Sequence, residues 1–298
     1  MLAEIPQLLV LGVTSGCIYA IAAVGFSIIY NSTQVINFAQ GEFVMIGAMT
    51  SAVLMERFPV IVAFPLAVAA GCLAGLVVAI CVLIPLRRST VVTLIIITVG
   101  ASITVRGLAQ LFWGETAILT APFTGVPDGF GGIKDRQFHF LSATVGAQEI
   151  WVVSVTTVLV IGLHLFFKYT LAGQAMRACA MNTGGARLVG ISVRRMIVLS
   201  FLMAAGLGAV AGVTVSPVFY AQYSMGTFLG LKGFCAAVLG GLGNFGGAVA
   251  AGIILGIVES LGSGFISSDF KDAIAFVILI LILFVRPRGL LSRGKAEA

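Results

Sequence analysis

Long apolar runs recur along almost the whole chain, and they limit the folds that it can adopt. A run of about 20 apolar residues is long enough to cross the hydrocarbon core of a bilayer as a helix. Only 9% of the residues are charged, against about 25% in soluble domains. We therefore predict an all-α polytopic membrane protein in which residues 1–298 form a single transmembrane domain. The runs lie near residues 8–30, 38–55, 60–86, 91–113, 149–167, 196–215, 228–243, 246–264 and 270–286.

Two of these nine runs are weak candidates for complete spans. The run 228–243 is only sixteen residues long, and the run 38–55 opens with polar residues. We predict about eight to ten crossings, of which one or two are made by short or broken helices. A transmembrane barrel would need segments of about ten residues with alternating polarity, a pattern that the sequence does not show.

The charged residues divide the polar segments into two groups. Basic residues dominate 87–90, 168–195 and the C-terminal segment, whereas most acids lie in the other intervals. Cytoplasmic loops carry an excess of Lys and Arg, so we predict a cytoplasmic loop at 168–195 and an external loop at 114–148. Nine crossings agree with an external N-terminus and a cytoplasmic C-terminus. A cleaved signal peptide begins with a basic region, whereas the first run here is preceded by an acidic residue. We therefore expect this run to be retained as a span.

The residue types that usually carry chemistry are scattered. The five cysteines have neither metal nor disulfide spacing, and the two histidines stand alone. There is no phosphate-binding G-x-x-x-x-G-K-[ST] motif, no G-x-S-x-G elbow and no H-E-x-x-H pair. We expect a protein that is not an enzyme, holds no metal or cofactor, and uses its net charge of +6 in topology rather than in binding nucleic acid.

The loop 168–195 contains signals for two short helices. Thr170 can cap a helix that continues to about Ala180, and Asn182 can cap a second helix that ends at Gly190 in a left-handed conformation. One interpretation is a basic loop that only fixes topology, and the other is a docking element. Apolar positions favour docking, since a topology signal does not need them: Ala175, Met176, Cys179, Leu188, Val189 and Ile191.

Polar residues interrupt the apolar pattern at the start of the run 38–55. Asn37 can cap a helix there, and Gln40 then falls at the N3 position of a capping box. Glu42 lies near the positive end of the same helix. The alternatives are a helix start anchored in protein, and a lining of the translocation route.

Three further charges fall within apolar runs. A charge at the centre of a spanning helix costs about 2.5–3.5 kcal/mol on insertion scales. Arg106 either extends toward the external interface or stays within the bundle, and Lys232 is expected to extend toward that interface. For Glu259 the alternatives are a structural polar contact, which we favour, and a lining of the translocation route. Glycine is concentrated in "GGLGNFGG" (240–247), which includes Asn244 and predicts an interrupted helix along a substrate route.

Three stretches carry a resemblance to a known family: "SGCIYAIAAVGFSIIYNSTQVINFAQGEF" (15–43), "AGQAMRACAMNTGGARLVGISV" (172–193) and "LKGFCAAVLGGLGNFGGAVAAGIILGIVES" (231–260). They resemble the LivH-type permeases, the membrane subunits of high-affinity branched-chain amino acid ABC importers. The resemblance implies a bacterial inner-membrane permease domain with a second, homologous permease subunit in a heterodimer. It also implies two ATP-binding subunits that use ATP, and a periplasmic solute-binding protein.

The resemblance also implies that the loop 168–195 is the coupling region that meets an ATPase subunit. The residues that this assigns to coupling are Ala175, Arg177, Asn182, Arg187, Leu188 and Gly190.

One position departs from the family pattern. Family members often have a histidine between the alanine and the glycine of the "NFA-x-GEF" motif, where this chain has Gln40. Relatives of the family serve urea, short amides and aromatic acids, so the substrate stays open between these and branched-chain amino acids. From the residues alone, an ion-coupled secondary transporter and a channel are further alternatives, although neither needs a docking loop.

Overall fold

The computed structural model describes residues 5–83, 90–123, 125–127, 133–140 and 143–265, with 273, 276, 277, 280, 281 and 284. The last predicted run, 270–286, lies largely outside these residues. The described elements are α1 (Ile5–Thr33), α2 (Gln40–Met55), α3 (Val60–Leu83), α4 (Val91–Trp113), β1 (Val126–Pro127), β2 (Ile133–Lys134), β3 (Gln137–Phe140), β4 (Ala143–Gly146), α5 (Ala147–Tyr169), α6 (Leu171–Met181), α7 (Thr183–Leu188), α8 (Val193–Val215), α9 (Met225–Gly240) and α10 (Phe245–Phe265).

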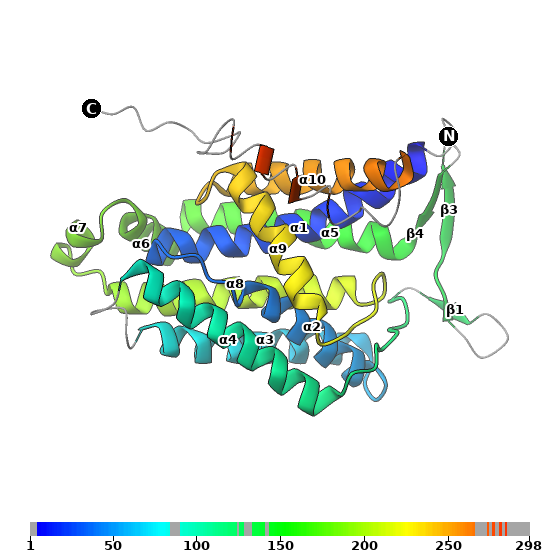
Figure 1. Cartoon of the computed structure of the whole chain (residues 1–298), viewed down its shortest axis with the longest axis horizontal. Coiled ribbons are helices and arrows are strands. Elements are labelled where there is room, and N and C mark those ends of the chain that lie inside the picture. Colours follow the sequence, from blue (N-terminus) through cyan, green and yellow to red (C-terminus); the bar gives the residue numbers. More distant parts are fainter. Residues whose placement is uncertain are drawn as a thin grey trace.

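Long helices lie side by side across the length of the molecule (Figure 1). In the described part of the chain, six are long and apolar enough to cross a membrane: α1, α3, α4, α5, α8 and α10. The helices α2 and α9 are apolar but have only 16 residues each. These two correspond to the runs that were expected to be short or broken. The prediction of an all-α polytopic membrane protein is confirmed.

The two ends of the bundle carry different structures (Figure 1). The short helices α6 and α7 project from one end, which we call the elbow end. The opposite end, which we call the strand end, carries the segment between α4 and α5. There β1 pairs with β2 and β3 pairs with β4, both antiparallel. These short strands were not predicted. An isolated bridge joins Ile118 of this segment to Ala221, and so ties it to the connection between α8 and α9.

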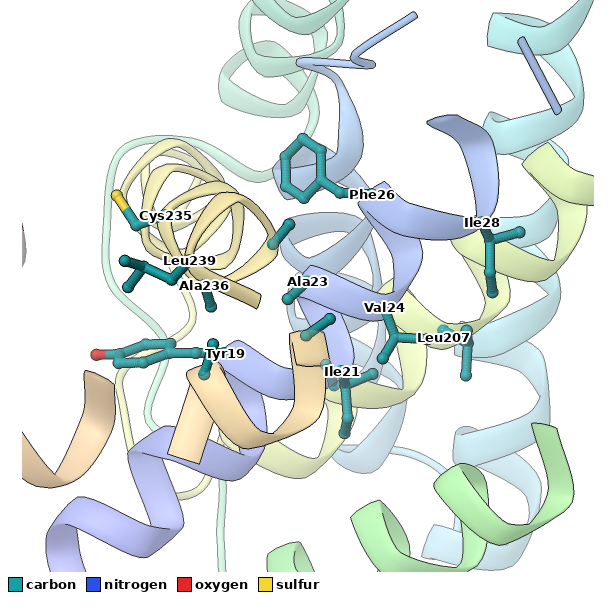
Figure 2. Packing of buried hydrophobic residues seen from close by; sticks show 14 of the residues in the cluster. Tyr19, Ile21, Ala23, Val24, Phe26, Ile28, Leu207, Cys235, Ala236 and Leu239 are labelled. Atoms are coloured by element: carbon teal, nitrogen blue, oxygen red, sulfur yellow. The ribbon is translucent and has the colours of Figure 1, made fainter. Parts of the chain in front are cut away.

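Helix α1 is at the centre of the bundle. Its residues are apolar on every side, which is typical of a helix surrounded by other helices. Figure 2 shows Tyr19, Ala23 and Phe26 of α1 near Cys235 and Leu239 of α9. The opposite flank of α1 meets α8, where Leu207 belongs to the same buried cluster.

Small residues allow the closest helix pairs to touch through their backbones. On α2 and α8, a Cβ added at Gly47 would overlap the backbone of Ala209, and one added at Gly212 would overlap the carbonyl of Val44. The glycines of α1 and α10 behave alike, since a Cβ at Gly256 would meet the backbone of Gly16. At these contacts the glycines allow close packing of the helices.

Replacing Gly212 by Ala is expected to destabilise the fold by about 1–3 kcal/mol, the usual cost of overpacking. The added methyl group would press on a backbone carbonyl of α2, which moves only if the helix moves. Gly162→Ala on α5 is the matched control, because nothing lies within 4 Å of its added Cβ. Thermal unfolding of both purified variants in detergent measures the difference. Equal unfolding temperatures would contradict the close α2–α8 contact.

Candidate functional site

After α1 the chain turns back into the interior of the bundle. Gln34 adopts a left-handed conformation with φ of 57°, and residues 34–39 are not helical. Helix α2 then begins at Gln40, whose Nε2 donates a hydrogen bond to the carbonyl oxygen of Ala204 at 3.0 Å. Ala204 is the middle residue of α8. Helix α2 therefore begins about halfway through the bundle.

Side chains satisfy the backbone of this non-helical segment. The hydroxyl of Thr98 on α4 accepts a hydrogen bond from the Phe38 amide at 3.3 Å and lies 3.4 Å from the carbonyl oxygen of Ile36. The Asn37 Oδ1 accepts from the Ala39 amide at 3.1 Å. Irregular backbone at membrane depth is tolerated only where protein or a water-filled cavity surrounds it. Both polar side chains thus make the interruption possible.

The predicted capping box at the start of α2 is wrong. Ala39 precedes the helix and no side chain caps it, so Asn37 serves the turn before the helix instead. Gln40 is the first helical residue and its side chain bonds to α8 rather than returning to the helix start. The reason is that the chain needs two more residues, Phe38 and Ala39, to change direction before α2 can begin.

Glu42 lies at the point where α2, α4 and α9 meet. Its Oε1 accepts a hydrogen bond from the hydroxyl of Ser102, the middle residue of α4, at 2.8 Å. Arg106, one turn farther along α4, interacts electrostatically with the same carboxylate. The Arg106 guanidinium donates to the hydroxyl of Thr227 on α9 at 2.8 Å. Of the two alternatives for Arg106, the structure shows the contact within the bundle, because its guanidinium is held between α4 and α9.

The start of α9 closes this site from the other side. Gly226 and Gly230 of α9 lie directly against Gly41 of α2, and a Cβ at Gly41 would overlap the carbonyl of Gly226. The N-termini of α2 and α9 thus meet inside the bundle beside Glu42. We call the residues Asn37, Gln40, Glu42, Ser102, Arg106 and Thr227 the central polar cluster.

Several polar atoms of this cluster are buried without a hydrogen-bond partner. Within the described part of the chain they are the Nδ2 of Asn37, the Oε1 of Gln40 and the Oε2 of Glu42. The side chains themselves are at most 1% exposed. Buried polar groups normally find partners, and exceptions call for water, an ion or a functional explanation. The concentration of three such atoms within residues 37–42 marks this segment as a candidate site.

A second buried polar contact joins α1, α9 and α10. The Lys232 ammonium lies 2.8 Å from the Glu259 Oε1, and the Tyr19 hydroxyl donates to the same oxygen at 3.1 Å. The expected extension of Lys232 to the interface is wrong: the side chain is 8% exposed, because α9 begins early enough to place Lys232 near its middle. Glu259 makes the structural polar contact that was expected. A cavity of about 240 Å³, lined in part by Thr14 and Ser260, reaches Glu259.

The glycine-rich stretch 240–247 is a turn rather than an interrupted helix, so this prediction is wrong. Helix α9 ends at Gly240, α10 begins at Phe245, and the two form a hairpin whose turn lies toward the elbow end (Figure 1). Gly243 has φ of 87°, and its carbonyl accepts from the Asn31 side chain at 3.0 Å. Asn244 accepts a hydrogen bond from the Gly247 amide in the first turn of α10, and it is not part of the central polar cluster.

The elbow, residues 168–195, has the two capped helices that the sequence predicts. The Thr170 hydroxyl accepts from the Gly173 amide at 3.0 Å, and the Asn182 Oδ1 accepts from the Gly185 amide at 2.9 Å. Gly190 follows α7 with φ of 83°. These contacts confirm both N-caps and the left-handed C-cap.

The side chains of the elbow divide into anchors and free positions. Met176 and Cys179 are buried against the bundle, so the idea that they serve a partner is wrong. Burial raises the pKa of the Cys179 thiol. The positions left on the surface include Leu188, 90% exposed, and Val189, 75% exposed. Arg177 and Arg187 are also exposed, while Ala175 is partly buried.

Comparison with known proteins places the chain in a family. Residues 8–283 match the family described as "Branched-chain amino acid transport system / permease component". The chain belongs to this family. It is 35% identical to the high-affinity branched-chain amino acid transport system permease protein LivH of Escherichia coli K12, and 34% to LivH of Salmonella typhimurium, each over 96% of this chain and 95% of the relative. It is 32% identical to BraD of Pseudomonas aeruginosa over 98% of this chain and 97% of the relative.

Replacing Lys232 by Met is expected to destabilise the protein by about 3–5 kcal/mol, since it leaves the Glu259 carboxylate buried without its cation. The double variant Lys232→Met/Glu259→Leu should recover most of this loss, because an apolar pair of similar volume is often tolerated in place of a buried ion pair. Denaturant unfolding of the single and double variants measures the coupling. A double variant as unstable as the sum of the two single variants would show that the pair is not coupled.

Proposed function

We propose that this chain is a membrane-spanning permease subunit of an ABC importer and that it passes branched-chain amino acids, or a closely related small solute, across the bacterial inner membrane. Membership of the permease family supports the class, and the names of LivH and BraD support the solute. The observation that carries the mechanism is the elbow. Its capped helices project from the bundle and expose basic and apolar side chains together, as a docking element requires.

The charges of the elbow support its orientation. Arg177, Arg187, Arg194 and Arg195 are all exposed at this end, and cytoplasmic loops carry such an excess of basic residues. In the proposal, the elbow end faces the cytoplasm and the strand end faces the periplasm. The N-terminus then lies outside and the C-terminus inside. Surrounding lipid covers the apolar outer faces of helices such as α3 and α5.

The proposed importer needs partners that this chain does not supply. Two ATP-binding subunits would hydrolyse ATP, so no cofactor is expected in this chain itself. A second, homologous permease subunit would complete a heterodimer, and a periplasmic binding protein would deliver the solute at the strand end. Specificity would then be shared between the binding protein and the polar groups of the central polar cluster.

Contacts of the hairpin α9–α10 support a route for coupling. At the elbow end, Phe167 of α5 stacks on Phe245 with ring centroids 4.7 Å apart, and Phe167 and Met176 line one small cavity with Phe245. At its other end, α9 touches Gly41 of α2 through Gly226. Movement of the elbow would therefore be transmitted through α9 to the place where α2 begins. In this mechanism the bundle rocks as a rigid body and access to the centre alternates.

Reversing the charge of the elbow by Arg177→Glu or Arg187→Glu is expected to abolish copurification with the ATP-binding subunits. Both arginines are exposed, so in the proposed complex they attract an acidic surface of the partner that a glutamate would repel. Arginines that only fix topology would leave the complex intact after the change. Arg57→Glu, in the exposed turn between α2 and α3, is the matched control and should leave the complex intact. Pull-down of the complex from detergent-solubilised membranes measures the difference.

Crosslinking provides an independent check on the docking surface. Cysteine placed at Leu188, whose side chain is 90% exposed, should crosslink to an ATP-binding subunit. Native Cys179 should not, because it is buried. Absence of crosslinks at several exposed positions of α6 and α7 would count against the elbow as the docking element.

An ion-coupled secondary transporter is the competing function. It would need intramembrane carboxylates that are available to a coupling ion. Glu259 is already paired with Lys232, and Glu42 accepts from Ser102. Uptake in vesicles that contain an ion gradient but no nucleotide would support that function and contradict the ABC importer.

Gln40 provides a test of whether the start of α2 contributes to solute preference. Gln40→Leu should lower stability by about 0.5–1.5 kcal/mol, because the side-chain hydrogen bond to the Ala204 carbonyl is lost while that carbonyl keeps its bond within α8. Gln40→His keeps a ring N–H for that carbonyl, so we expect near-normal stability with an altered order of competition among leucine, phenylalanine, urea and acetamide. Competition against labelled leucine uptake measures this order. An unchanged order with normal stability would limit Gln40 to anchoring α2.

A further inference from the structure

One face of the bundle exposes polar groups at membrane depth. Helix α4 has only three buried residues, Leu94, Thr98 and Ala109, so most of its surface is free for lipid or for another subunit. Ser102, Arg106 and Thr227 are partly buried on the side where α4 approaches α9. The buried Glu42 lies behind them. We call this the α4–α9 face.

Arg106 does not escape to an aqueous surface. Its Cα lies four residues from the middle of α4, about 6 Å along the helix axis. The guanidinium donates to the Thr227 hydroxyl at 2.8 Å, and this contact holds it at this depth. A partly exposed arginine in contact with lipid is unfavourable, and such residues face a bundle interior or a water-filled cavity. The α4–α9 face is therefore expected to border protein and water.

Apolar residues flank the polar strip. Ile103 on α4 is 56% exposed and Phe228 on α9 is 52% exposed. This composition, a narrow polar strip with apolar borders, matches a subunit interface that encloses a route for a polar solute. A surface that only met lipid would not place an arginine in the strip.

We propose that the α4–α9 face lines the solute route opposite the second permease subunit, and that Arg106 is a specificity-determining residue that pairs with the carboxylate of the passing amino acid. Glu42 receives the ammonium group of the same solute. This inference rests on the proposed function as an amino acid permease. It adds the chemical group that is recognised, the residues that recognise it, and the face of the chain that meets the solute.

The charges of the site support an exchange of partners. In the present arrangement Glu42 accepts a hydrogen bond from Ser102, and Arg106 donates one to Thr227. A zwitterionic amino acid brings one negative and one positive group, so it replaces both partners without leaving a net charge inside the membrane. The solute thus satisfies both charges of the site at the same time.

Two further features favour an ammonium group beside Glu42. The N-termini of α2 and α9 meet beside Glu42 through Gly41 and Gly226, and helix N-termini stabilise the negative charge of this carboxylate. The buried, unpartnered Oε2 of Glu42 and Oε1 of Gln40 are acceptors that an ammonium group can satisfy. The site therefore offers complementary partners to both ends of an amino acid backbone.

Cysteine accessibility in the assembled importer tests whether the face borders water. Ser102→Cys and Thr227→Cys are introduced into a parent with Cys72→Ser and Cys81→Ser, and Ile103→Cys is the matched control at the same depth of α4. We expect hydrophilic methanethiosulfonates to modify positions 102 and 227 at least about tenfold faster than position 103, a difference of about 1.4 kcal/mol in barrier. Equal rates at the three positions would overturn the proposal.

The sign of the reagent tests the role of Arg106. With Arg106 present, an anionic methanethiosulfonate should modify Ser102→Cys faster than a cationic one, relative to their rates with free cysteine. Arg106→Gln should remove this preference. A preference that is absent in the parent, or unchanged in the variant, would contradict the assignment of a carboxylate partner.

Uptake of labelled leucine tests specificity in membranes that contain the complete importer. Arg106→Gln should lower ATP-dependent uptake about tenfold or more, with Arg106→Lys restoring part of it, while the amount of assembled complex stays normal. Thr227→Val removes the hydrogen bond but keeps the charge, so it should lower uptake less than Arg106→Gln does. Equal losses in both variants, or normal uptake with Arg106→Gln, would overturn the proposal. Failure of the unmodified importer to take up leucine would instead contradict the proposed function.

Discussion

A backbone inside a bilayer must satisfy its own hydrogen bonds, and this constraint shapes the centre of the protein. The segment 34–39 leaves the helical conformation at membrane depth, so its amides and carbonyls need other partners. Thr98 and Asn37 provide them, and both belong to the small set of polar residues in otherwise apolar surroundings. Once that segment is held, α2 can begin in the middle of the bundle, and its glycine-rich start can meet the start of α9. The central polar cluster follows from the interruption.

The buried charges follow a related rule, since each of them has a partner on another helix. Lys232 and Glu259 pair across the α9–α10 hairpin, and Arg106 of α4 donates to Thr227 of α9. The two sites differ in their surroundings. Lys232 and Glu259 are both almost fully buried, which suits a fixed structural contact between two helices. Arg106 is only partly buried, so that its partners can be exchanged when another charged group approaches along the α4–α9 face.

The success of the sequence-based predictions depended on how local each signal is. The caps at Thr170, Asn182 and Gly190 involve residues three or four positions apart, so a short pattern contains all of the relevant contacts. The bond from Gln40 to Ala204 joins residues 164 positions apart, and no short pattern contains it. The same holds for Arg106, whose partner Thr227 is 121 residues away, and for Lys232, which the apolar run alone places too close to its end. The candidate residues 37, 40 and 42 could be named from their polarity, but their partners required the packed helices.

The hairpin α9–α10 links the elbow to the central polar cluster. Its turn lies beside the elbow, where Phe245 stacks on Phe167, and its first residues lie against Gly41. Between these ends Lys232 ties α9 to α10 through Glu259. Contacts made through glycine leave no flexible side chain to absorb a shift, because backbone touches backbone. In the proposed mechanism a displacement at the elbow would therefore be passed along α9, and it would reach the central polar cluster as a relative movement of the N-termini of α2 and α9.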